Sequence, residues 1–228
     1  MMSIQELLPH IELMESGDRL MVPPAPRPYS VVAVGTASGD TEQRRSACAR
    51  LIRVGWVSMT CAERTQAAFG CEPILVGPGE DLDTARLAFS MERAGELLEA
   101  HPPGTVGLIA GPMPTLASAS DDLVNVLLEA LARARAAGAT LVGYVPHPCP
   151  GLFEGWLDPG ERTPWSRASD MRFCYVNVGH AVLRLETYEI APEQHDRVVA
   201  IAVAQLQAGF PRAFREAERP QAATVPKA

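Results

Sequence analysis

The side chains of this sequence that are best suited to chemistry lie in two short stretches. Residues 146–151 read Pro-His-Pro-Cys-Pro-Gly, which places His147 and Cys149 two residues apart. A cysteine thiolate next to a histidine base is a nucleophile, or a ligand for heme or a metal. The alternating prolines support another interpretation, a rigid polyproline-like turn in which side chains two apart diverge. The sequence leaves both interpretations open.

The second stretch, residues 174–180, contains Tyr175 and His180. A tyrosine hydroxyl, with a pKa near ~10, donates a proton when it is held against a leaving group. His180 follows a glycine and is a candidate to face a substrate pocket. The structural alternative for both is packing in an apolar segment.

A predicted strand–helix–strand unit must position these residues. Its strands are residues 105–110 and 140–145, and its helix is residues 123–137, closed by Gly138. The helix carries one apolar stripe at the spacing of a buried face: Leu123, Val126, Leu127, Ala130, Leu131 and Ala134. Ligands of α/β folds gather at the carboxyl ends of such strands.

Further elements extend this unit into one α/β domain. The pattern predicts strands at 29–34 and 73–77, helices at 41–59, 61–69 and 82–100, a paired apolar segment at 173–190, and a last helix from Pro192. Residues 146–169 form a long loop, which favours a functional flap over a spacer. The predicted organisation is an arm (1–28), a single α/β domain (29–211) and a flexible tail (212–228).

Two segments resemble the GCN5-related N-acetyltransferases, the GNAT superfamily. Residues 127–144 are similar to the central helix and following strand of that family. Residues 174–180 stand where the family has an aromatic pair, three residues, then glycine and an aromatic, and residues 179–189 continue like its last hairpin. The resemblance spans about residues 104–191. It implies a mixed, twisted sheet flanked by helices, to which this chain adds an N-terminal arm and a C-terminal helix.

The resemblance also implies an activity, transfer of an acyl group from acetyl-CoA or another acyl-CoA to a small-molecule amine or hydroxyl. In the family, acyl-CoA lies in a V-shaped splay between the two middle strands, with its pyrophosphate on the central helix N-terminus. Tyr175 matches the tyrosine that protonates the departing thiolate. The implied cofactor-binding residues are Leu108, Ile109, Ala110, Ser118, Ser120 and Leu123.

The phosphate loop departs from the family pattern. Residues 118–124 contain neither glycine nor a base, and Asp121 and Asp122 already complement the helix dipole behind the N-cap candidate Ser120. One alternative is therefore a non-catalytic GNAT-like protein that binds a ligand or a partner. Another is a cofactor-free lyase, isomerase or hydrolase that works through Cys149, His147 or His180.

Composition limits the class of partner. The 228 residues carry a net charge of −7 with a pI near 5.3, which argues against nucleic acid and anionic membranes. No apolar run approaches the roughly 20 residues that cross a bilayer. Five scattered cysteines without a C-x-x-C pair indicate a reducing cytoplasm and no metal site. We therefore expect a cytoplasmic protein with a small-molecule substrate, and leave a homodimer open.

Overall fold

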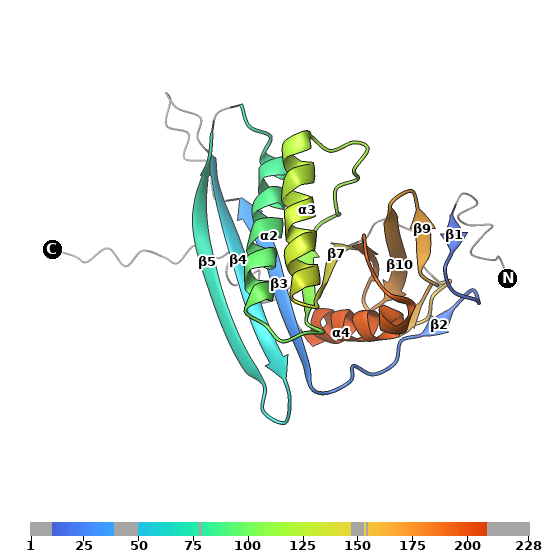
Figure 1. The fold of residues 1–228 in the computed structure, drawn as a ribbon. Coiled ribbons are helices and arrows are strands. Elements are labelled where there is room, and N and C mark those ends of the chain that lie inside the picture. Colours follow the sequence, from blue (N-terminus) through green and yellow to red (C-terminus); the bar gives the residue numbers. More distant parts are fainter. Residues whose placement is uncertain (1–10, 39–49, 78, 147–152, 154, 209–228) are drawn as a thin grey trace.

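One mixed β-sheet runs through the molecule, and helices cover both of its faces (Figure 1). The computed structural model describes residues 11–38, 50–77, 79–146, 153 and 155–208. None of the helices in these ranges is long and apolar enough to span a bilayer.

The strands follow the order β1-β9-β10-β11-β7-β6-β3-β4-β5, with β8 pairing β10 and β2. Their bounds are β1 Glu12–Leu13, β2 Leu20–Met21, β3 Tyr29–Ser38, β4 Arg50–Cys61, β5 Gln66–Val76, β6 Val106–Ala110, β7 Thr140–Pro146, β8 Glu161–Arg162, β9 Ser166–Ala168, β10 Met171–Asn177 and β11 Val182–Thr187. The helices are α2 Leu82–Glu99, α3 Asp121–Ala136, the 3₁₀ turn η1 Pro192–Gln194 and α4 His195–Ala208.

The sheet joins an antiparallel meander to a parallel centre. Strands β3, β4 and β5 are successive antiparallel neighbours, while β3 pairs in parallel with β6, and β6 with β7. The two crossovers between these strands are α2 and α3. Beyond β7 the sheet continues antiparallel through β11, β10 and β9, and β1 of the N-terminal arm adds to its edge.

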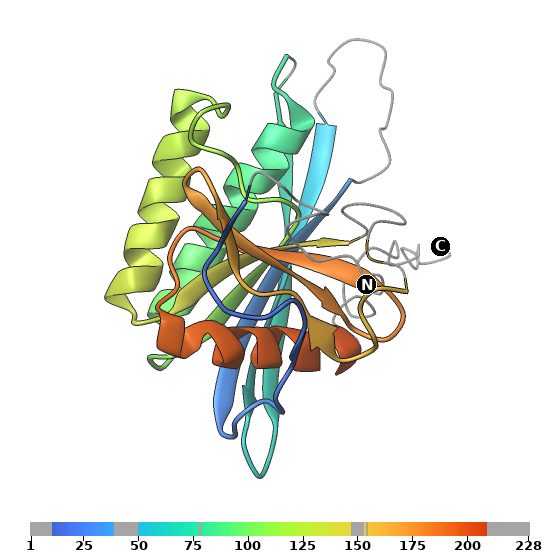
Figure 2. The same ribbon diagram turned by 90° about the vertical axis from the view of Figure 1, so that its right-hand side faces the viewer.

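Alternating side chains of the central strands divide the core into two. Val32, Val34 and Ile109 pack under α2 and α3, whereas Val31, Ala33 and Leu108 pack under α4 on the opposite face (Figure 2). This period of two is the strand signature of two buried faces. Helices α2 and α3 also approach closely, because a Cβ at Gly95 would lie 3.4 Å from the Cα of Ala130.

The predicted helices at 82–100 and 123–137 and the strands around them are confirmed, but two other predictions are wrong. Residues 41–59 and 61–69 were expected to be helical. Residues 41–49 lie outside the described residues, and 50–59 and 61–69 belong to the long hairpin β4–β5. The β-branched residues of this stretch favour strands, and Ile52, Val54 and Trp56 share one face at strand spacing, so burial beneath α2 overrides the helix-like spacing.

The expected GNAT-like architecture is also wrong, although the broader α/β class with helices flanking a mixed sheet holds. A GNAT fold would open a splay between the middle strands, which here are β6 and β7. These strands stay paired from Val106 opposite Thr140 to Ala110 opposite Tyr144. The Gly111 amide then donates to the Tyr144 carbonyl at 3.0 Å. No gap opens at the carboxyl end where the acyl-CoA would enter.

Candidate functional site

A pocket of about 570 Å³ lies at the carboxyl ends of β3 and β6. Both α2 and α3 begin at this end of the sheet (Figure 1), so two helix N-termini border the pocket. This edge of an α/β sheet is where ligands generally bind, because the loops leave the strands there and helix dipoles point their positive ends at it. The lining includes Thr36 from β3 and Ala110 from β6.

Hydroxyl groups dominate the polar lining of this pocket. They belong to Thr36, Thr84, Ser90, Thr115, Ser118 and Ser120. Three of them, Thr115, Ser118 and Ser120, are in the segment that joins β6 to α3, and the Thr115 and Ser118 hydroxyls hydrogen-bond to each other. Hydroxyls rotate to donate or accept, so such a lining suits a ligand that is rich in oxygen.

Three charged side chains reach the pocket, Asp81, Asp83 and Arg86. Asp81 is the N-cap of α2, and its Oδ2 accepts from the amide of Thr84 at 2.9 Å and from its hydroxyl at 2.6 Å. Nη1 of Arg86 donates to Oδ1 of Asp83 at 3.2 Å. Both carboxylates therefore already have partners within the protein.

The Nε atom of Arg86 differs from these groups. It is buried and has no hydrogen-bond acceptor among the described residues. A buried guanidinium donor without an acceptor costs free energy, but Nε is closed to solvent and a ligand in the pocket does not contact it directly. The Arg86 side chain as a whole is 26% exposed, and it supplies the one cationic group among the described residues of the pocket lining.

The loop that forms one wall is held in place from the neighbouring strands. The amide of Met113 donates to Oε2 of the buried Glu186 at 2.7 Å, and the hydroxyl of Tyr188 donates to the carbonyl of Pro114. Burial raises the pKa of Tyr188 to about 12, so the hydroxyl keeps its proton and remains a donor over the physiological range. The wall is thus preorganised rather than shaped by a ligand.

Four of the predicted cofactor-binding residues line this pocket: Ala110, Ser118, Ser120 and Leu123. Ser120 caps α3, since its Oγ accepts from the Leu123 amide at 3.4 Å. Leu108 and Ile109 are fully buried in β6, between β3 and β7 and on opposite faces of the sheet.

The structure does not bring Tyr175 and His180 to the pocket. Tyr175 is buried on β10, where its ring lies 4.3 Å from that of Phe153, centroid to centroid. His180 is exposed in the turn between β10 and β11. His147 and Cys149 lie outside the described residues.

Sequence reasoning missed the residues of α2 that line the pocket. Asp81, Asp83, Thr84 and Arg86 stand at the start of a helix that was predicted almost to the residue. An aspartate directly before an apolar-periodic segment is a helix N-cap signal, and it marks where the helix meets the edge of the sheet. That signal could have directed attention to this end of α2.

Comparison with protein families and with curated proteins gives no match for this chain. Among solved structures, the NurA nuclease from Sulfolobus solfataricus is 10% identical with a TM-score of 0.45, covering 89% of this chain and 77% of that one. Endonuclease V from Bacillus subtilis is 12% identical with a TM-score of 0.43, covering 95% of each chain. Thermus thermophilus RuvC is 18% identical with a TM-score of 0.24, covering 49% and 62%.

These comparisons correct several predictions. The neighbours are nucleases rather than GNAT acetyltransferases, so the GNAT assignment, the acyltransferase activity and the acyl-CoA cofactor are wrong. The cofactor-free lyase, isomerase or hydrolase and the non-catalytic GNAT-like protein gain no support either. The exclusion of nucleic acid in favour of a small-molecule substrate is also contradicted. Net charge averages over the whole surface and does not report on a local site.

Divalent metal ions serve many phosphoryl-transfer enzymes and need several carboxylate or histidine ligands placed together. Within the described ranges, no group of three or more His, Cys, Asp or Glu side chains is placed to hold a metal ion. The strand ends contribute Thr36 and Ala110 in place of carboxylates, and the two aspartates of α2 are engaged by Thr84 and Arg86. The described residues do not fit a resident metal.

Proposed function

We propose that this chain binds nucleic acid and that the pocket between the N-termini of α2 and α3 receives a backbone phosphate. The observation that carries the proposal is a pocket lined by hydroxyl-bearing side chains and by Arg86 and bordered by two helix N-termini. Arginine, serine and threonine side chains and helix N-termini are the usual donors to phosphate oxygens.

The charges around the pocket allow a backbone phosphate to bind, but only weakly. Asp83 is paired with Arg86 and Asp81 is occupied in capping α2, while Asp121 and Asp122 in the first turn of α3 offset the positive end of its dipole. The net charge of −7 opposes the approach of a polyanion. We therefore expect weak binding that falls steeply with salt.

Fluorescence anisotropy with a 5′-phosphorylated, 3′-fluorescein-labelled single-stranded oligonucleotide tests this proposal. At low salt, the Arg86→Ala variant should bind about tenfold more weakly than wild type, equivalent to about 1.4 kcal/mol. Its salt dependence should be shallower by about one phosphate contact. Arg135→Ala is the matched control. It removes an exposed arginine of α3 that pairs with Glu189, and it should bind like wild type. Absence of binding in wild type, or equal losses in both variants, refutes the proposal.

A second candidate function is cleavage of the bound strand. The observation in its favour is that Asp81 and Asp83 line the same pocket. They form no resident metal site, but one or two carboxylates together with a substrate phosphate would hold a Mg²⁺ that arrives with the substrate. The same oligonucleotide, incubated with Mg²⁺ or Mn²⁺, should remain intact if the chain only binds. Cleavage that is lost in Asp81→Asn and Asp83→Asn would establish the second candidate instead.

A further inference from the structure

Strand β5 is the outermost strand of the sheet, and the described residues do not cover it. The opposite edge ends in β1 of the N-terminal arm, a strand of only two residues that pairs with β9. Along β5, only Val76 is fully buried; Phe69 is 86% exposed and Leu75 is 73% exposed. An open edge with exposed large apolar side chains is a typical site for adding another strand.

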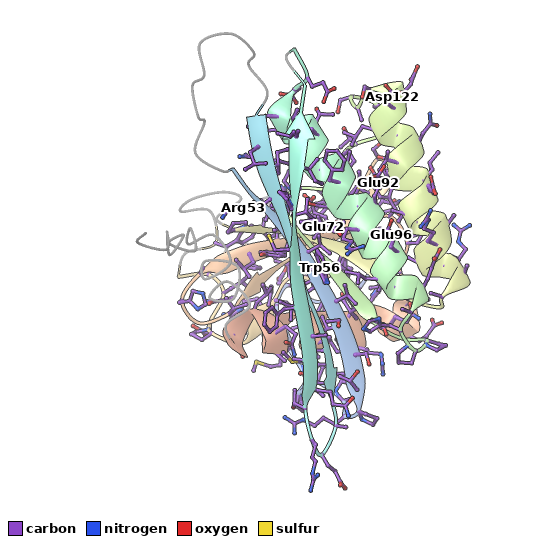
Figure 3. All side chains as sticks on the ribbon, turned by 90° about the vertical axis from the view of Figure 1, so that its left-hand side faces the viewer. Arg53, Trp56, Glu72, Glu92, Glu96 and Asp122 are labelled. Atoms are coloured by element: carbon purple, nitrogen blue, oxygen red, sulfur yellow. The ribbon has the colours of Figure 1, made fainter. Side chains whose placement is uncertain are left out.

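The two faces of β5 differ in character. On the α2 side, Gly70 packs against Trp56, and Glu72 pairs with Arg93 at 3.3 Å. Figure 3 shows Trp56 and Glu72 on this side, together with the α2 residues Glu92 and Glu96. This face is therefore already engaged with the helix layer.

The other face of β5 is apolar along the whole strand. Its side chains, which alternate with those that face α2, are Ala67, Phe69, Cys71, Pro73 and Leu75, and all five are exposed. They lie opposite Met59, Val57, Gly55, Arg53 and Leu51 of β4. On this side of the sheet the α4 core reaches β4, where Cys61 joins it and Val57 and Met59 pack against it. Among the described residues no helix extends over the exposed side chains of β5 itself.

We propose that β5 is a self-association edge, to which a second copy of this chain adds its own β5 in antiparallel orientation with the two Cys71 residues opposite each other. A two-fold axis through this point relates the edges, which is the commonest symmetry of homodimers. The pairing extends the sheet across both copies and keeps like faces on the same side.

The side chains of β5 are complementary to themselves in this register, while its backbone ladder lacks one hydrogen bond per copy, because Pro73 has no amide to donate to the Phe69 carbonyl opposite. Phe69 of each copy lies opposite Pro73 of the other, and Ala67 lies opposite Leu75, so every cross-strand pair on the exposed face is apolar. Glu72 lies opposite Gly70 on the α2 side, and the two Glu72 carboxylates do not face each other. Like charges directly opposite one another destabilise strand pairs. Glu72 is the only charged side chain of β5, and in this register it does not face its own copy.

Sedimentation equilibrium over a dilution series, under reducing conditions, tests for the dimer. Wild type should show a reversible monomer–dimer equilibrium, and Phe69→Glu should raise the dissociation constant at least tenfold by placing a carboxylate in an apolar contact. Leu128→Glu is the matched control, since Leu128 is half exposed on α3 and far from β5, and it should behave like wild type. A monomer at every concentration, or a dimer that is indifferent to Phe69→Glu, overturns the proposal.

Cysteine cross-linking tests the register. In a background with Cys48 and Cys149 replaced by serine, a short bismaleimide should join two copies through the exposed Cys71, whereas Cys61 and Cys174 are buried. Moving the thiol to the hairpin, with Cys71→Ser and Glu63→Cys, should abolish the product, because the two sites would then lie roughly 50 Å apart. Equal cross-linking at position 63 contradicts the register. If the chain stays monomeric and binds a different protein through Phe69, then the partner of β5 is not a second copy of this chain.

Discussion

The guanidinium of Arg162 is buried and forms the main polar contact between the N-terminal arm and the body. It is 1% exposed, donates to both carboxylate oxygens of Glu15 at 2.6 and 3.0 Å, and reaches Oδ1 of Asp196 at 2.7 Å. The Trp165 amide also donates to Glu15 at 2.6 Å. Breaking a buried pair is costly because it leaves the other charge uncompensated, whatever the pair itself contributes.

Replacing Arg162 should consequently destabilise the protein strongly. We expect Arg162→Met to lower the free energy of unfolding by about 3–5 kcal/mol, measured by urea denaturation. The comparison is Arg167→Met, which removes a similar contact to the arm, with Glu12, on the surface. Exposed pairs contribute little, so this variant should unfold near the wild-type midpoint. Equal losses would show that burial is not the source of the effect.

The layer between hairpin β4–β5 and helix α2 is organised around Trp56. The guanidinium of Arg93 lies 3.9 Å from the centre of the indole ring, and Gly70 of β5 supports the ring on the sheet side. A Cβ at position 70 would lie 2.1 Å from Cζ2 of Trp56, so no side chain fits there. The glycine sets how closely the hairpin and the helix approach.

Gly70→Ala should destabilise the contact by forcing Trp56 away from its position. Overpacking of this kind costs typically 1–3 kcal/mol, so we expect a loss of about that size in urea denaturation. Trp56→Phe replaces the indole by a smaller ring. In that background Gly70→Ala should lower the free energy of unfolding by clearly less than it does in wild type. An unchanged penalty in the double variant would place the cause in the strand backbone rather than in the contact with Trp56.

At the scale of the whole molecule, the sheet is closed at one edge by its own N-terminal segment. Burial acts to raise the pKa of Glu15, but the hydrogen bonds and charge of Arg162, with the Trp165 amide, outweigh it and hold the pKa below the ordinary 4.5. A lowered folded-state pKa means that Glu15 stabilises the folded state above about pH 4.5 and loses this effect as the pH falls through its folded value.

Acid should therefore loosen the attachment of the arm. We expect the urea midpoint of wild type to fall below about pH 4.5, while Glu15→Gln, less stable near neutral pH, shows a flatter profile. The two profiles should converge in acid, because the protonated wild type and the variant are then both uncharged at this position. A constant gap between the two proteins at all pH values would exclude Glu15 titration as the cause.

The sequence predicted the elements that local pattern specifies. The stripe from Leu123 to Ala134 and the caps of α3 defined a helix because both signals lie within one segment. The hairpin β4–β5 was missed because Val54 and Trp56 owe their positions to burial against α2, a partner beyond the local window. The pocket was missed for a related reason. Thr36 of β3, Arg86 of α2 and Ser118 before α3 are far apart in sequence, and only the folded sheet brings them to one pocket.

The separation in sequence between Glu15 and its partners has a consequence for synthesis in the cell. Glu15 leaves the ribosome early, but Arg162 follows it by 147 residues. At about 5–20 residues per second, the arm waits roughly 7–30 seconds before its binding partner exists. The segment around Glu15 is thus made well before the strands it docks on, and it must remain available, and not pair elsewhere, while the sheet is completed.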